Sequence, residues 1–285
     1  MVPFFFAGII GNFIEHIITS SKNDTNMVLS SIPQQVGLVY ALIAIPLIFY
    51  LYHKGKFKTP VQLVFLLLST LLGFLIFAPV APYQFQQVLF GETRKLGLPL
   101  EAVLFFLILF ILLTVFGGRA YCSAVCPIGA IQELFSKVPV PKISIPWKRA
   151  VLIIHLVVGI VFVFFALFIP NFPVKCMGMK YFFYLEITSL KFYLFALIMV
   201  IGLFIYRPFC RFICPYGLLL TAAAYFSIFK LRRTSDCITC KKCEKICPVG
   251  EAYENSNKAE CFLCGRCTNV CPVKGALEYS RKKDT

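Results

Sequence analysis

The sequence has few charged residues: only 14% of its 285 residues are Asp, Glu, Lys or Arg. A typical soluble domain carries about 25%, so this composition excludes an ordinary water-soluble globular domain. Hydrophobic residues make up 59% of the chain, and the mean hydropathy is +0.81. The composition therefore predicts an integral membrane protein.

Acidic residues are the scarcer charge, with 13 Asp and Glu against 28 Lys and Arg and a net charge of +15. In a membrane protein this excess indicates cytoplasmic loops rather than a nucleic-acid partner, so no nucleic acid is expected. The opening residues, MVPFFFAGII, lack the basic stretch and cleavage site of a signal peptide, so no removable leader is predicted. No nucleophile–base pair or Gly-rich phosphate loop accompanies the cysteine motifs.

Long apolar runs predict a polytopic all-α membrane protein, because a membrane span needs about 20 mostly apolar residues. Five spans are expected, at 36–52, 61–81, 99–117, 150–170 and 189–206. Residues 3–19 have a polar stripe, which fits either an interfacial amphipathic helix or a sixth span. The chain is thus divided into an N-terminal segment (1–35), a transmembrane domain (36–230) and a Cys-rich tail (231–285).

The orientation of the spans follows from the basic residues in the short loops. One set of connections is richer in Lys and Arg, and it carries Lys54, Lys56, Lys58, Arg119, Lys137, Lys142, Lys148, Arg149, Arg207 and Arg211. We therefore place this side, and with it the tail, in the cytoplasm. The reducing cytoplasm also suits the thiolates of the tail.

The strongest motif lies in the tail, which holds eight of the 13 cysteines. The pattern C-x2-C-x2-C-x3-C-P occurs at Cys237, Cys240, Cys243 and Cys247 and again at Cys261, Cys264, Cys267 and Cys271. In bacterial two-cluster ferredoxins the fourth Cys of each run binds the other cluster. We therefore assign one [4Fe–4S] cluster to Cys237, Cys240, Cys243 and Cys271, and a second to Cys261, Cys264, Cys267 and Cys247. Structural zinc is the alternative, but zinc ribbons have two CxxC pairs about 15–20 residues apart.

A second pair of motifs forms an internal repeat, RAYCSAVCPIG (119–129) and RPFCRFICPYG (207–217). The cysteines of each pair are four positions apart, which predicts that both lie on one face of a helical turn. If the repeats pack about a pseudo-two-fold axis, Cys122, Cys126, Cys210 and Cys214 meet at the inner membrane boundary. Four thiolates there fit an iron–sulfur cluster or a tetrahedral metal. The spacing leaves a quinone contact and redox disulfides open, and unreactive buried cysteines are the structural alternative.

Two CxxxCP motifs at the inner ends of spans, followed by a two-cluster ferredoxin tail, resemble the membrane-bound polyferredoxins. These include the quinol dehydrogenase ferredoxin subunit of periplasmic nitrate reductase systems, and the resemblance covers about residues 60–280. It implies quinol oxidation and electron relay to a partner redox protein through the cysteines named above. Relatives in cytochrome oxidase maturation imply the alternative of an iron–sulfur or copper-linked maturation factor. Residues 1–55 depart from the four-span subunit of that family.

Some weaker candidate ligands stand outside these motifs. His155 and His53 could ligate a b-type haem, but a lone His in a span more often hydrogen-bonds within the bundle, so haem is not expected. Cys176 with Met177 and Met179 offers soft ligands for copper(I), although a spare loop thiol explains it as well.

The sequence therefore predicts a multi-pass protein of the prokaryotic cytoplasmic membrane with a small ferredoxin-like α+β module on the cytoplasmic side. Its expected function is to relay electrons between the quinone pool, or a membrane partner, and a redox partner protein. The partner would be another electron-transfer subunit or a soluble ferredoxin-like carrier. The lysines of CKKCEKIC would suit an acidic carrier.

Overall fold

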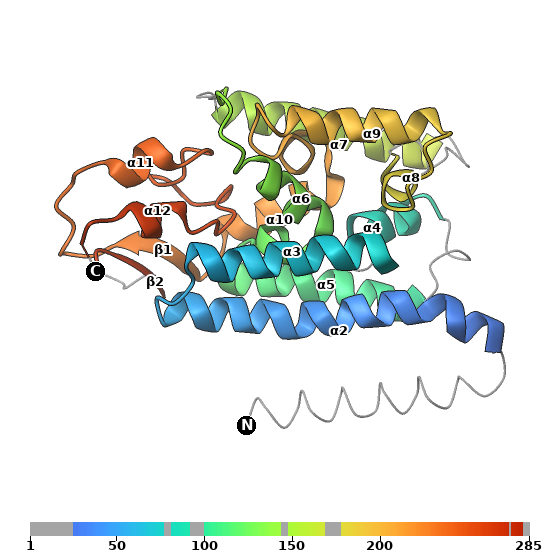
Figure 1. Ribbon diagram of the computed structural model, residues 1–285, viewed down its shortest axis with the longest axis horizontal. Helices are drawn as coiled ribbons and strands as arrows, with labels where there is room; N and C mark the ends of the chain where they lie inside the picture. Colours follow the sequence, from blue (N-terminus) through green and yellow to red (C-terminus); the bar gives the residue numbers. More distant parts are fainter. Residues whose placement is uncertain are drawn as a thin grey trace.

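The computed structural model describes residues 25–76, 81–91, 100–143, 148–168, 178–273 and 275–281. The long helices run along the long axis of the molecule, and the Cys-rich tail gathers at one end of them (Figure 1). The predicted amphipathic segment at 3–19 and the thiol of Cys176 lie outside the described residues.

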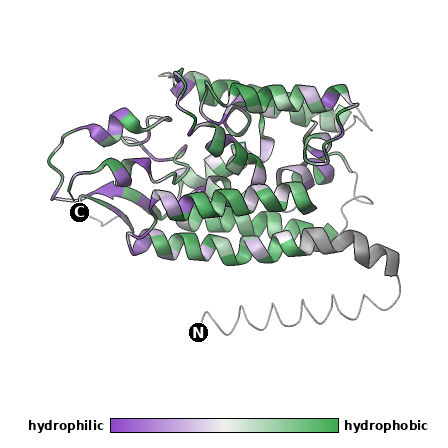
Figure 2. Ribbon diagram, viewed as in Figure 1, coloured by the Kyte–Doolittle hydropathy of each residue, from purple (hydrophilic) through white to green (hydrophobic). Residues whose placement is uncertain are grey.

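The long helices are strongly apolar (Figure 2). They are α2 (Thr25–His53), α3 (Thr59–Ile76), α5 (Leu100–Gly117), α7 (Lys148–Phe168) and α9 (Leu190–Ile201). Three stretches are long and apolar enough to cross a membrane: Val36–His53, Leu100–Gly117 and Lys148–Ala166. The remaining two, Thr59–Leu75 and α9, are shorter apolar helices. Within the described residues the protein is mostly helical with three candidate membrane spans, and the number of five spans stays a prediction.

The largest departure concerns α9, which was expected to run through residue 206. It ends at Ile201, and residues 202–207 form a turn in which Arg207 has a φ of 50°. Because Arg207 precedes Pro208, the helical conformation is disfavoured at this residue. The turn feeds the chain directly into the second CxxxCP motif.

The outer helices present apolar side chains to their surroundings. On α7, for example, Leu152, Ile153 and Val157 are about half exposed, whereas Val151 and His155 are buried. Exposed apolar surface of this extent is stable in a lipid environment, where water is absent. The exposure pattern thus agrees with a membrane location for these helices.

Short helices fill the centre between the long ones. They are two π-helical turns, η2 (Tyr121–Val125) and η4 (Phe209–Ile213), each followed by a short α-helix, α6 (Pro127–Phe135) and α10 (Pro215–Tyr225). Helix α6 packs on α3 and α9, while α10 packs on α5 and α7. Two further helices, α4 (Ala81–Leu89) and α8 (Met179–Phe183), lie at the end opposite the tail (Figure 1).

The tail combines two strands with two short helices, as expected for an α+β module. Strand β1 (Phe229–Arg233) pairs antiparallel with β2 (Leu277–Arg281), and the strands flank α11 (Lys242–Ile246) and α12 (Arg266–Val270). The first strand begins two residues before the expected boundary at residue 231. Tyr279 of β2 donates a hydrogen bond to the Gly117 carbonyl (2.6 Å), which ties the tail to the end of α5.

Candidate functional site

The two CxxxCP motifs adopt the same local structure. In each, a π-helical turn carries the first Cys, and the backbone N–H of the second Cys closes the turn. Cys126 donates to the Tyr121 carbonyl and Cys214 to the Phe209 carbonyl, both at 2.9 Å. The sequence repeat is therefore a structural repeat.

The prediction that each Cys pair shares one face of a regular helical turn is wrong. Cys122 lies in the π-helix, whereas Cys126 is extended, with a ψ of 123°, and caps the start of α6. Cys214 is extended in the same way, with a ψ of 109°, before α10. The following proline causes this geometry, because it disfavours the α conformation of the residue before it. π-Helical turns are frequently found at functional sites.

All four of these thiols are buried, and they come together between the two repeats. Each of the four interacts electrostatically with the other three. Among the described residues, no three His, Cys, Asp or Glu side chains form a site for a single metal ion. We name Cys122, Cys126, Cys210 and Cys214 the boundary thiols.

Hydrogen-bond donors surround the boundary thiols. The Gln132 side chain donates to the Cys210 sulfur (3.5 Å), and the Gly217 backbone N–H donates to the Cys214 sulfur (3.2 Å). Cys126 and Cys214 also stand at the N-termini of α6 and α10, where the helix dipole favours negative charge. Burial nevertheless raises the pKa of the Cys126 thiol to about 12, so the donors offset the cost of a buried thiolate only in part.

Glycine is required where the repeat folds back on itself. A Cβ atom on Gly129 would lie 2.5 Å from the Cys122 carbonyl oxygen, and one on Gly217 would lie 3.1 Å from the Cys210 carbonyl oxygen. The glycine that ends each motif therefore lets the short helix approach the π-turn of its own repeat.

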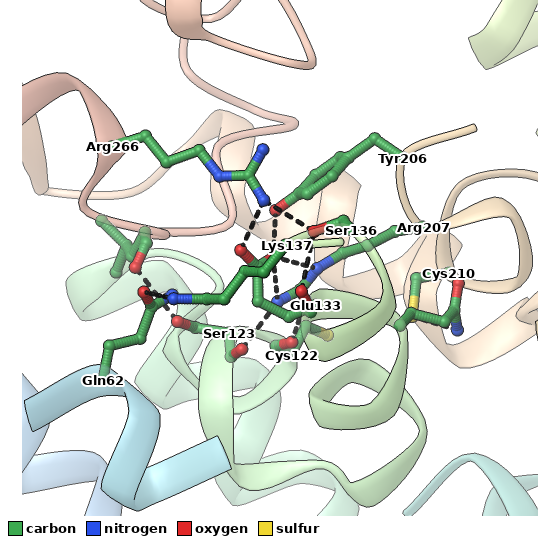
Figure 3. Close-up of polar contacts among 12 residues, drawn as sticks. Gln62, Cys122, Ser123, Glu133, Ser136, Lys137, Tyr206, Arg207, Cys210 and Arg266 are labelled. Carbon is green, nitrogen blue, oxygen red and sulfur yellow. Dashed lines mark hydrogen bonds and ion pairs between the residues drawn. The ribbon is translucent and has the colours of Figure 1, made fainter. Parts of the chain in front are cut away.

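A buried polar network joins the repeats to the tail (Figure 3). Glu133 of α6 forms an ion pair with Arg207 of the second repeat (3.0 Å) and another with Arg266 of the tail (2.9 Å). Tyr206 donates a further hydrogen bond to Glu133 (2.7 Å). Arg207 also donates to the carbonyls of Cys122 and Ser123. One carboxylate thus connects three parts of the chain that are distant in sequence.

The arginines of the repeats do not face the solvent. Arg119, Arg207 and Arg211 are all buried. Arg211 forms an ion pair with Glu260 (3.4 Å), and Arg119 lies 4.1 Å from the centre of the Phe262 ring. They were expected among the loop charges that set the orientation of the spans, but they serve contacts inside the protein. The predicted orientation of the spans therefore depends on the remaining basic residues of the loops.

His155, a candidate haem ligand, contacts the boundary site through the backbone. Its Nε2 atom lies 2.8 Å from the Cys214 carbonyl oxygen, within hydrogen-bond distance. This is the bundle hydrogen bond that was expected as the alternative to haem. It also fixes the extended residue Cys214 against α7.

The tail cysteines line two cavities. The first is lined by Cys237, Cys240, Cys243 and Cys271, and the second by Cys247, Cys261, Cys264 and Cys267. Each cavity thus brings together three cysteines of one run and the fourth cysteine of the other. Arg233 and Leu277 border both cavities, so the two are adjacent. Four thiols around a cavity match the ligand set of a [4Fe–4S] cluster.

The second cavity is the more deeply placed of the two. Burial raises the pKa of the Cys261 thiol to about 12, so that the protein alone favours the protonated thiol. Metal binding displaces such protons. Cys240 of the first cavity is exposed instead.

The loop of the second cavity is seated on the first repeat. The Leu263 carbonyl accepts hydrogen bonds from Ser123 (3.1 Å) and from Tyr52. Phe262 inserts between Arg119 and Arg207, whose guanidinium carbons lie 4.1 and 4.8 Å from its ring centre. The tail is thereby fixed next to the boundary thiols.

Sequence reasoning missed Glu133, Phe262 and Arg266. Glu133 left a usable signal, because it is a single acid in the apolar segment PIGAIQELF. An ionisable residue in such a segment is a functional candidate by default. Phe262 and Arg266 left none, because the spacing of the cysteines around them says nothing about what these side chains contact.

Comparison with known families gives two matches in this chain. The family described as "4Fe-4S binding domain" matches residues 100–146 and 192–234, which contain the two CxxxCP repeats. The family description thus falls on the boundary thiols. No solved structure gives a significant match.

Three related proteins illustrate the similarity. "Putative electron transport protein YccM" of Escherichia coli (strain K12) is 27% identical, over 52% of this chain and 46% of that protein. An uncharacterized protein of Methanocaldococcus jannaschii is 31% identical, over 50% of this chain and 56% of that protein. "Protein NirI" of Paracoccus denitrificans (strain Pd 1222) is 35% identical, over 47% of this chain and 22% of that protein.

The chain matches about half the length of the first two of these relatives, and the match to the third covers a smaller share. The chain thus combines two segments that match a 4Fe-4S binding family with three helices long and apolar enough to cross a membrane. The two CxxxCP repeats are therefore similar to a 4Fe-4S binding family, and the chain is similar over about half its length to a putative electron-transport protein.

Proposed function

We propose that this protein relays electrons between quinol in the cytoplasmic membrane and a redox partner protein on the cytoplasmic side. In this proposal the boundary thiols hold one iron–sulfur cluster, and the two tail cavities hold one [4Fe–4S] cluster each. Bound clusters of this kind supply one-electron transfer. The chain itself positions the clusters, excludes water from them and tunes their potentials.

One observation carries the proposal: a single hydrogen bond links the boundary thiols to the second cavity. Ser123 directly follows Cys122, and its hydroxyl donates to the carbonyl of Leu263, which directly precedes Cys264. An electron can therefore pass between the two sites through covalent bonds and one hydrogen bond of 3.1 Å. The second cavity in turn shares walls with the first, whose Cys240 is exposed. These contacts support electron transfer from the boundary thiols to the second cavity and from there to the first cavity.

The iron content of the purified protein tests this proposal. Three clusters require about 12 iron atoms per chain. We expect anaerobically reconstituted protein to approach that value, and Cys122→Ser or Cys210→Ser to lower it to about eight. Chemical iron analysis and EPR spectroscopy measure both. Unchanged iron in these two variants would remove the boundary cluster from the proposal, and a zinc-loaded, colourless protein would end it.

The outer cavity is the expected contact point for a soluble carrier. Lys241 and Lys242 are exposed beside it, and Ile238 is 62% exposed at the same edge. We expect Lys241→Glu with Lys242→Glu to slow electron transfer to an acidic soluble ferredoxin about tenfold at low salt, because opposite charges steer association. Stopped-flow rates at several ionic strengths measure this effect.

The matched control reverses two exposed lysines away from the cavity, Lys54 and Lys56, in the loop after α2. This change has the same effect on net charge. An equal loss of rate in the control, or a rate that does not depend on salt, would contradict docking at the outer cavity.

A further inference from the structure

Arg119 and Arg207 occupy equivalent positions in the two repeats, yet their surroundings differ. Arg207 has an ion pair with Glu133 and donates to two backbone carbonyls. Arg119 is only 1% exposed, and its Nε and Nη2 atoms have no hydrogen-bond partner. The two repeats differ next to the arginine, which precedes Ala120 in the first and Pro208 in the second, but the partners of each arginine come from other segments of the chain.

The charge of Arg119 lacks a counter-charge among the described residues. The other two buried arginines of the repeats have carboxylates, Glu133 for Arg207 and Glu260 for Arg211. Burying a charged group without a partner is unfavourable, because the group loses its hydration. The Phe262 ring, whose centre lies 4.1 Å from the guanidinium carbon of Arg119, offsets only part of this cost. Within the part of the chain that the structure describes, the charge of Arg119 is thus not neutralised by a carboxylate.

Arg119 cannot easily leave this position. The preceding residue, Gly118, has a φ of 79°, and the Arg119 carbonyl accepts a hydrogen bond from Ser123 in the π-turn (3.1 Å). Phe262 of the tail covers the guanidinium. The side chain is thus held three residues before Cys122, on the turn that carries the boundary thiols.

We propose that Arg119 is the counter-charge of an anionic group held by the boundary thiols and that it raises the reduction potential of that group. This inference rests on the proposed function. Four thiolates outweigh the positive charge of an oxidised iron–sulfur core, so a cluster bound there is anionic, whereas two disulfides would be neutral. Reduction adds one electron to the group, and the positive charge of Arg119 stabilises this more negative state further. Arg119 is therefore a positioning and tuning residue of the boundary centre.

A redox titration followed by EPR tests the proposal in the reconstituted full-length protein. We expect Arg119→Gln to make reduction of the boundary centre roughly tenfold less favourable, which is about 59 mV for a one-electron couple. Arg119→Lys keeps the charge and should hold the potential near that of the wild type. The potentials of the two tail centres should stay unchanged in both variants.

The iron content and the reduction potential of the Arg119 variants together test the charge requirement. Boundary iron lost in Arg119→Gln but kept in Arg119→Lys would also support a charge requirement. An unchanged potential in fully loaded Arg119→Gln would overturn the proposal. Boundary iron lost equally in both variants, with full tail iron, would overturn it too, since the shape of the guanidinium would then matter. A wild type with only about eight iron atoms would instead refute the proposed boundary cluster itself.

Discussion

Glu133→Gln is expected to destabilise the protein by roughly 3–5 kcal/mol, the range for breaking a buried ion pair by removing one partner. Glu133 and Arg207 are both fully buried, and Arg266 approaches the same carboxylate. Glutamine has nearly the same shape but no charge, so two guanidinium groups would be left without an anion. The thermal midpoint in detergent should fall sharply.

The change should also loosen the tail, because Arg266 belongs to the tail and Glu133 to α6. Limited proteolysis should therefore release fragments of the tail from Glu133→Gln sooner than from the wild type. Glu254→Gln is the matched control. Glu254 is 78% exposed and pairs with Arg233 at 3.9 Å, and such surface pairs contribute about 0–1 kcal/mol. A midpoint that moved equally little in both variants would show that the Glu133 network does not hold the tail in place.

Single cysteine substitutions should reveal crossed ligation in the tail. Cys247→Ala is expected to remove the same EPR signal as Cys261→Ala, although the two residues belong to different runs. Cys271→Ala should likewise remove the signal that Cys237→Ala removes. Each variant should lose about four iron atoms per chain. The reason is that Cys247 and Cys271 are extended before their prolines and line the cavity formed by the other run.

Cys243→Ala supplies the internal reference for this experiment, because Cys243 lines only the first cavity. The crossed assignment fails if Cys247→Ala and Cys243→Ala abolish the same signal while the signal lost in Cys261→Ala persists. That pattern would mean that each run of four cysteines holds its own cluster.

Some of the local structure around the CxxxCP motifs follows from the sequence alone. The proline after each CxxxC motif restricts the residue before it, and α6 and α10 begin at these prolines. The effect of proline on the preceding residue did not predict the π-turns. For that reason the prediction that each Cys pair lies on one face of a regular helical turn was wrong. The end of α9 at Ile201 was missed because apolar composition continues through the turn at 202–207.

The surroundings of the arginines show where local reasoning stops. Arg119 and Arg207 stand in nearly identical sequences, and both were expected in loops. Arg207 is neutralised by Glu133, whereas Arg119 is covered by Phe262 and has no carboxylate partner among the described residues. These partners come from different segments of the chain, so no window of sequence contains both members of a contact.

The amino-acid sequence by itself determined which thiols are available, their spacing, and the apolar stretches that favour a membrane, because each depends on residues close together in the chain. Only the tertiary structure decided that a tail loop rests on the first repeat, through a hydrogen bond between residues 140 positions apart. It also decided which buried charges are neutralised. Such contacts depend on how all the helices pack at once, and packing is a property of the whole chain.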